Sequence, residues 1–68
     1  MKSKLVRVKQ FDYITVFRDV RSLLTSDIFV HRAQDLPHAI KAGRKYVRDL
    51  NRQIGRKIYY YENTYRSR

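Results

Sequence analysis

Five basic residues in the middle of the chain recur at spacings that place them on one side of a helix. They are Lys41, Arg44, Lys45, Arg48 and Arg52. At 3.6 residues per turn they fall within roughly 100° of arc, and Asp49 is the one residue of opposite sign beside them. Like charges four residues apart destabilise an isolated helix by a few tenths of a kcal/mol per pair. This cost favours an anion-binding face over a merely solvated one, and arginine suits bidentate contacts with phosphate.

An aromatic cluster follows the basic stretch. Its members are Arg56, Lys57, Tyr59, Tyr60, Tyr61 and Tyr65. Because side chains alternate along a strand, we expect Tyr60 to face the core together with Ile58. Tyr59, Tyr61 and Tyr65 then line the open face, or the reverse holds. Aromatic rings beside Arg and Lys form a stacking platform for unpaired bases, but the same rings also suit a half-buried strand or a protein–protein contact.

Patterns for catalysis or metal binding are poorly represented. The chain has no cysteine, and its two glycines are too few for a phosphate-binding loop. We interpret the hydroxyl residues between 22 and 26 as turn and cap residues rather than nucleophiles. His31 and His38 lie in different predicted elements, and the carboxylates are scattered along the chain. We therefore expect no enzyme activity, no cofactor and no metal site.

The basic residues lie on a helix that the sequence predicts from Asp35 to Ile54. Asp35 is a good N-cap, Pro37 falls in the first turn, and Gly55 suits the position just after the last turn. Apolar or small residues recur with helical periodicity on the face opposite the cations. These are Leu36, Ala39, Ile40, Gly43, Tyr46, Val47, Leu50 and Ile54.

Patterns with a period of two, typical of strands, flank this helix. Residues 56–65 follow it, and Asp27–Ala33 and Tyr13–Val20 precede it, all rich in β-branched and aromatic residues. Leu5–Lys9 alternates too and either pairs with the next strand or continues into it, while 21–26 is a connection. The order β-(β)-β-α-β predicts a small two-layer α+β domain. Its three- or four-stranded, mainly antiparallel sheet has one face under the amphipathic helix and the other open.

Length and composition restrict the class of protein. Sixty-eight residues make a single domain, 1–68, with a core over about 4–65 and a basic tail at 66–68. Sixteen Lys and Arg against six Asp and Glu give a formal charge of +10, which promotes binding to polyanions. The sequence shows no signal-peptide pattern and no apolar run long enough to cross a bilayer. We therefore expect a soluble, cytoplasmic protein.

The first functional hypothesis is a small nucleic-acid-binding module. The residues expected to contact phosphates are Lys41, Arg44, Lys45, Arg48, Arg52, Arg56 and Lys57, with Tyr59, Tyr61 and Tyr65 adding affinity. Sequence specificity should be weak or based on shape, because Asn51 and Gln53 are the few residues near the stripe that read base edges. DNA and RNA, single- or double-stranded, fit this pattern equally.

The alternative is a basic regulatory or inhibitor protein that docks onto an acidic surface of a host protein. Binding to a membrane surface is disfavoured, because the apolar helix face is needed to cover the sheet. A homo-oligomer is compatible with either hypothesis. No family motif is recognised. A small, basic, cysteine-free chain of this kind is similar in general character to accessory or regulatory proteins of phages and mobile elements.

Overall fold

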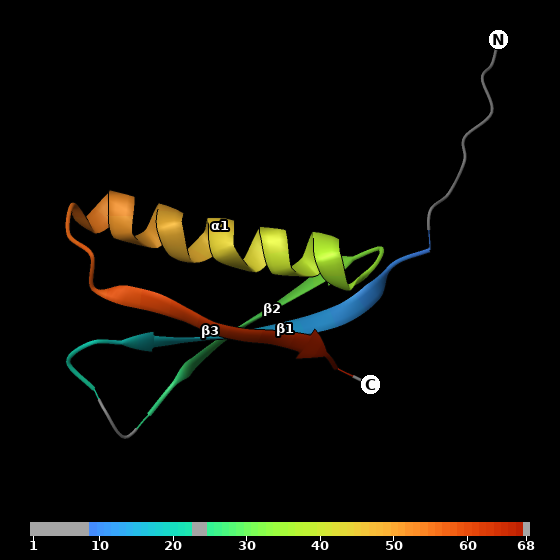
Figure 1. Ribbon diagram of the computed structural model, residues 1–68, viewed down its shortest axis with the longest axis horizontal. Coiled ribbons are helices and arrows are strands. Elements are labelled where there is room, and N and C mark those ends of the chain that lie inside the picture. The colour runs from blue at the N-terminus through green and yellow to red at the C-terminus, as the bar shows by residue number, and fades with distance from the viewer. Residues whose placement is uncertain (1–8, 23–24, 68) are drawn as a thin grey trace, which may run out of the picture.

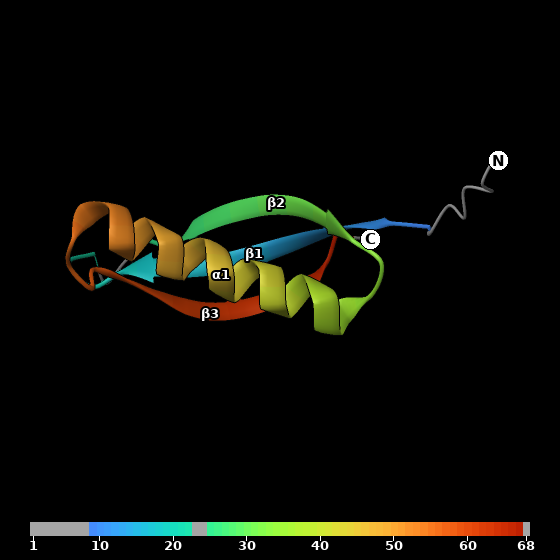
Figure 2. The same cartoon turned by 90° about the horizontal axis from the view of Figure 1, so that it is seen from above.

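The computed structural model describes residues 9–22 and 25–67 of the chain. The elements in chain order are β1 (Phe11–Asp19), β2 (Asp27–Ala33), α1 (Leu36–Ile54) and β3 (Tyr59–Arg66). β1 is the central strand, antiparallel to β2 on one side and to β3 on the other (Figures 1 and 2). The predicted α+β class, with three strands and one helix, is confirmed. Residues 5–8 of the alternating N-terminal segment and part of the predicted connection lie outside the described residues.

The boundaries of α1 follow from local chemistry that the sequence displays. The Asp35 carboxylate accepts a hydrogen bond from the backbone N–H of His38 at 3.0 Å, which satisfies an amide that has no partner within the helix. This bond, followed by the contact with the His38 ring, lowers the pKa of Asp35. At the other end Gly55 has φ 81°, and its N–H donates to the carbonyls of Asn51 and Arg52. Both predicted caps are confirmed.

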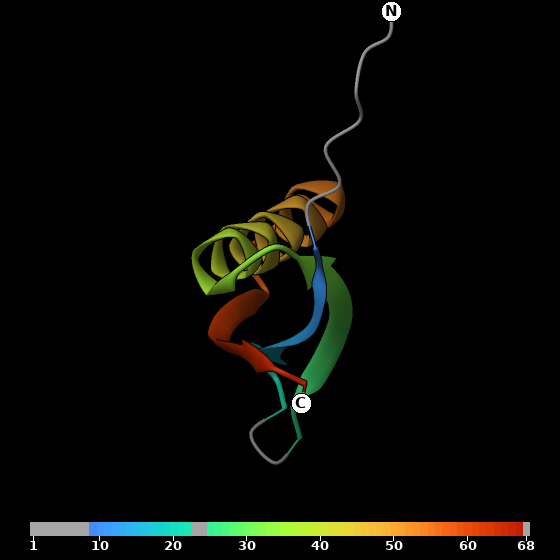
Figure 3. The same ribbon diagram turned by 90° about the vertical axis from the view of Figure 1, so that its right-hand side faces the viewer.

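α1 covers one face of the sheet, and no other described element lies on the opposite face (Figure 3). Along β1 the buried side chains are Tyr13, Thr15 and Phe17, and from α1 they meet Ala39, Gly43 and Val47. These helix residues are spaced four apart, so they form one row along the helix. The Phe17 ring meets the rings of Tyr46 and Tyr59 edge-on, each with a centroid separation of 5.6 Å.

The helix approaches the sheet most closely at Gly43. A Cβ built on this residue would collide with the Thr15 hydroxyl and would lie 3.0 Å from Oγ1 of Thr64. The absence of a side chain at Gly43 therefore lets the helix backbone lie directly over two buried hydroxyl groups. Those hydroxyls bond each other at 2.8 Å, so the polar atoms under the helix have partners.

A chain of polar side chains crosses the sheet beneath this contact. The Tyr61 hydroxyl donates to Thr64 Oγ1 at 2.8 Å, and Thr15 Oγ1 lies 2.7 Å from Nε2 of His31. When Nε2 of His31 carries no proton, it accepts from Thr15. Thr15 then accepts from Thr64, and Thr64 accepts from Tyr61, so all three hydroxyl groups donate a hydrogen bond. Burial lowers the pKa of His31 below its ordinary value, which favours the neutral imidazole.

A β-bulge in β3 interrupts the alternation of its side chains. Tyr61 is paired with Phe17 and Asn63 with Val16, so Glu62 is an extra residue without a direct partner on β1. The insertion reverses which positions face α1 from that point onward. As a result, the faces of β3 cannot be read from a single alternating pattern.

The predicted arrangement of the tyrosines is therefore wrong. Tyr59 and Tyr61, before the bulge, lie on the helix side of the sheet, where Tyr59 meets Phe17 and Tyr61 bonds Thr64. Tyr65, after the bulge, lies on the open face and is 45% exposed. Tyr60, expected in the core, is 39% exposed, whereas Ile58 beside it is buried. Neither the predicted open platform of three tyrosines nor its reverse occurs.

Substituting Gly43 by alanine tests the close approach. Alanine favours an ordinary exposed helix by up to about 1 kcal/mol over glycine, but here the methyl group collides with Thr15. We expect Gly43→Ala to lower the free energy of unfolding by about 1–3 kcal/mol, measured by urea denaturation. In a Thr15→Ala background the same substitution should cost markedly less. Equal costs in both backgrounds would contradict the contact.

The partly buried imidazole of His31 predicts a pH dependence of stability. Because the folded pKa of His31 lies below its unfolded value near 6.5, the unfolded chain binds the proton first as the pH falls. Stability is fully present above pH 6.5 and declines toward the lowered folded pKa. We expect a lower thermal midpoint at pH 5 than at pH 7.5, and a flatter profile in His31→Gln, whose amide can still bond Thr15. Identical profiles for the two proteins would exclude His31 as the cause.

Candidate functional site

A groove lies between the C-terminal half of α1 and the beginning of β3. Its volume is about 700 Å³. The lining residues are Arg44, Val47, Arg48, Asn51, Arg52, Gly55, Arg56, Lys57, Tyr59, Tyr60 and Tyr61. Figure 2 shows α1 crossing the sheet obliquely. The groove lies along the C-terminal half of this helix, beside the residues that follow Gly55. It therefore joins the predicted basic helix face to the predicted aromatic cluster.

The charge of this groove is entirely positive. Its lining includes four arginines and one lysine, and none of the described residues that line it is acidic. All five cationic residues are exposed, and within the described part of the chain none of them forms an ion pair with a carboxylate. The guanidinium carbon of Arg44 lies 5.2 Å from the centre of the Tyr61 ring. This cation–π contact holds the Arg44 side chain against Tyr61.

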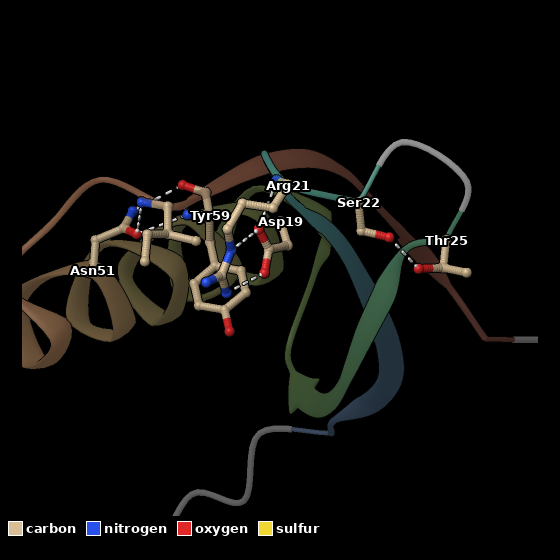
Figure 4. A network of polar contacts seen from close by, with 7 residues as sticks. Asp19, Arg21, Ser22, Thr25, Asn51 and Tyr59 are labelled. Atoms are coloured by element: carbon tan, nitrogen blue, oxygen red, sulfur yellow. Dashed lines mark hydrogen bonds and ion pairs between the residues drawn. The ribbon is translucent and has the colours of Figure 1, made fainter.

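Asn51 fixes the shape of the groove. Its side-chain N–H donates to the Tyr59 carbonyl at 2.8 Å, and its Oδ1 accepts from the N–H groups of Ile58 and Tyr59 at 2.9 and 2.8 Å (Figure 4). These three bonds fasten the start of β3 to the last turns of α1. Asn51, which the sequence suggested as a residue that reads base edges, thus uses its side-chain amide for hydrogen bonds to the backbone. In the sequence, the position of Asn51 four residues before the capping residue Gly55 is what could have indicated this role at the helix end.

A carboxylate beside this end of β3 is already paired with a cation. Asp19 is the register partner of Tyr59 and accepts hydrogen bonds from the backbone N–H and the guanidinium of Arg21 (Figure 4). The side-chain bond from Arg21, followed by the backbone bond, lowers the pKa of Asp19. The carboxylate therefore stays ionised and paired, and it competes little for the cations of the groove.

The structure brings together most, but not all, of the predicted site residues. Those that line the groove are Arg44, Arg48, Arg52, Arg56, Lys57, Tyr59 and Tyr61. Lys45 instead lies beside Phe29 and Tyr46 near β2 and bonds Asp49 at 2.8 Å, and this bond lowers the pKa of Asp49. Lys41 is exposed outside the groove lining, and Tyr65 lies on the open sheet face. Tyr60, which the alternation assigned to the core, borders the groove, but its pairing with Arg18 places its side chain on the open face of the sheet.

Two further features, metal-ligand clusters and membrane-spanning helices, are absent from the described residues. Within 9–22 and 25–67, no three His, Asp or Glu side chains are grouped so that they could hold a metal ion. No helix in that part of the chain is both long and apolar enough to cross a membrane. Comparison with known proteins adds no assignment: no family model, curated protein or solved structure matches the chain.

The role of Asn51 predicts that replacing this half-buried side chain lowers the stability of the fold substantially. Asn51→Ala removes three hydrogen bonds to the backbone, each with a net worth of about 1 kcal/mol. We expect it to lower the free energy of unfolding by roughly 2–3 kcal/mol in a urea titration. Gln53→Ala, on an exposed position of the same helix, is the matched control and should stay within about 0.5 kcal/mol of the parent. Similar losses in both variants would contradict the role of Asn51.

Proposed function

We propose that this protein binds nucleic acid by placing a stretch of sugar–phosphate backbone in the groove between α1 and β3. The observation that carries the proposal is a groove of about 700 Å³ lined by five cations and no described carboxylate. Bringing these cations together costs electrostatic free energy in the unbound protein, and a polyanion reverses that cost. Four of the five are arginines, whose planar fork matches phosphate oxygens.

The polar groups of the groove support weak or shape-based specificity. Asn51 is occupied by backbone bonds, and the Tyr61 hydroxyl is occupied by Thr64. Few side chains remain to read the edges of bases. The half-buried rings of Tyr59 and Tyr61 in the groove lining offer a surface on which an unpaired base could stack, so a single strand gains a contact that a duplex does not.

An acidic protein partner would use the same cations and is the alternative outcome of the test. The two partners differ in what they release on binding. A nucleic acid carries condensed counterions, so its affinity falls steeply and linearly with the logarithm of salt concentration. A folded acidic protein has no such uniform atmosphere, so the salt dependence of its binding should be shallower.

The proposal is tested by removing one charge inside the groove and one outside it. Arg48→Gln and Lys45→Gln alter neighbouring turns of α1 by the same charge, but only Arg48 lines the groove. For duplex DNA, Arg48→Gln should reduce the slope of log K against log salt by about 0.9, or by about 0.7 for a single strand. Lys45→Gln should leave that slope nearly unchanged.

Fluorescence anisotropy with labelled single- and double-stranded DNA and RNA measures these slopes. Equal slopes for the two variants would show that the overall charge, rather than the groove, holds the ligand. Absence of binding to all four oligonucleotides at low salt would overturn the proposal and leave an acidic protein as the partner to test.

A further inference from the structure

The open face of the sheet, opposite α1, has an apolar centre. Cross-strand pairing places two rows of side chains there: Val30, Ile14 and Tyr65 in one, and Ile28, Val16 and Asn63 in the next. Ile28 is 60% exposed and Val30 is 59% exposed. Because α1 occupies the other side of the sheet, no described element shields these β-branched side chains from water. A contiguous apolar patch that stays exposed on a monomer is often functional.

Among the residues that the structure describes, each end of this face carries one cation and one anion. At one end Arg32 bonds Asp12 at 3.3 Å, and at the other Arg18 bonds Glu62 at 2.7 Å. These four charges cancel, so the entire formal charge of +10 is carried by the rest of the chain. An apolar centre with a polar rim of both signs is the composition of a protein–protein interface.

We propose that this face packs against the same face of a second copy of the chain, forming a two-fold dimer by sheet-to-sheet contact. Two molecules of a +10 chain repel each other least when they meet through their neutral faces. Neither a polyanion nor an anionic membrane finds net positive charge there. A two-fold contact is also self-complementary, because each rim offers the partner a guanidinium and a carboxylate.

The size of the face sets the strength of this dimer. Three strands about 4.8 Å apart, with about 3.3 Å per residue, give a surface of roughly 14 by 20 Å. This face is smaller than the area of about 800 Å² that a standard interface buries on each partner. We therefore expect a weak, reversible dimer. The groove lies on the α1 side of the sheet and stays accessible in the dimer. The proposed dimer therefore requires no ligand in the groove.

Sedimentation equilibrium of the full chain, without nucleic acid, tests the dimer. The mass should rise from 8.3 kDa toward twice that value as the concentration approaches about 500 μM, as expected of a small interface. Raising the salt from about 50 to about 300 mM should tighten association several-fold, because salt screens the repulsion between the two copies. This dependence is opposite to that expected for nucleic acid in the groove.

Two variants of equal charge locate the interface. Val30→Lys places a cation in the apolar part of the face, on the edge strand β2, and should weaken association at least tenfold. Gln53→Lys adds the same charge on an exposed position of α1 and should change association less than twofold. Ile28→Thr keeps a β-branched strand residue and should weaken association several-fold, so it serves if Val30→Lys fails to fold by circular dichroism. A mass of 8.3 kDa at every concentration and salt, or equal association of the two lysine variants, overturns the proposal.

Discussion

The close approach of α1 to the sheet at Gly43 is the contact on which the rest of the structure depends. Without a side chain at this position, the helix backbone lies against the hydroxyls of Thr15 and Thr64. The contact at Gly43 sets the distance between the helix and the sheet. From there α1 crosses the sheet obliquely (Figure 2). One consequence is a row of small residues facing inward. The other is that the C-terminal half of the helix and the start of β3 enclose a groove between them.

The core formed in this way is small, and it explains why polar contacts carry so much of the fold. The buried hydrophobic residues are Tyr13, Phe17, Ala33, Ala39, Val47 and Ile58, and two of these are alanines. The chain from His31 to Tyr61 and the bonds of Asn51 supply order that apolar packing alone would not. In so small a domain each buried hydrogen bond is a large fraction of the total stability. A ligand or partner that binds only the folded state adds to it by mass action.

The helix and the strands were predictable from the sequence because their signals are local. Asp35, Pro37 and Gly55 mark the ends of α1 within a few residues of where they act. The bulge at Glu62 was not predictable, because it exists only in the pairing of β3 with β1, two segments more than forty residues apart in sequence. One inserted residue moved Tyr65 to the opposite face from Tyr61. The separation of Lys45 from Arg48 likewise depends on which strand lies under each side of the helix.

Charge in this protein is divided between two surfaces, and the division links them. The groove concentrates five of the cations, whereas the open sheet face holds two balanced pairs. Repulsion between two copies of the chain is screened over about a Debye length, roughly 8–10 Å at physiological salt, so the charge of the groove opposes contact through the neutral face mainly at low salt. A polyanion in the groove removes part of that opposition. If both proposals hold, polyanion binding and self-association must favour each other to the same extent, since coupling between two binding equilibria is reciprocal.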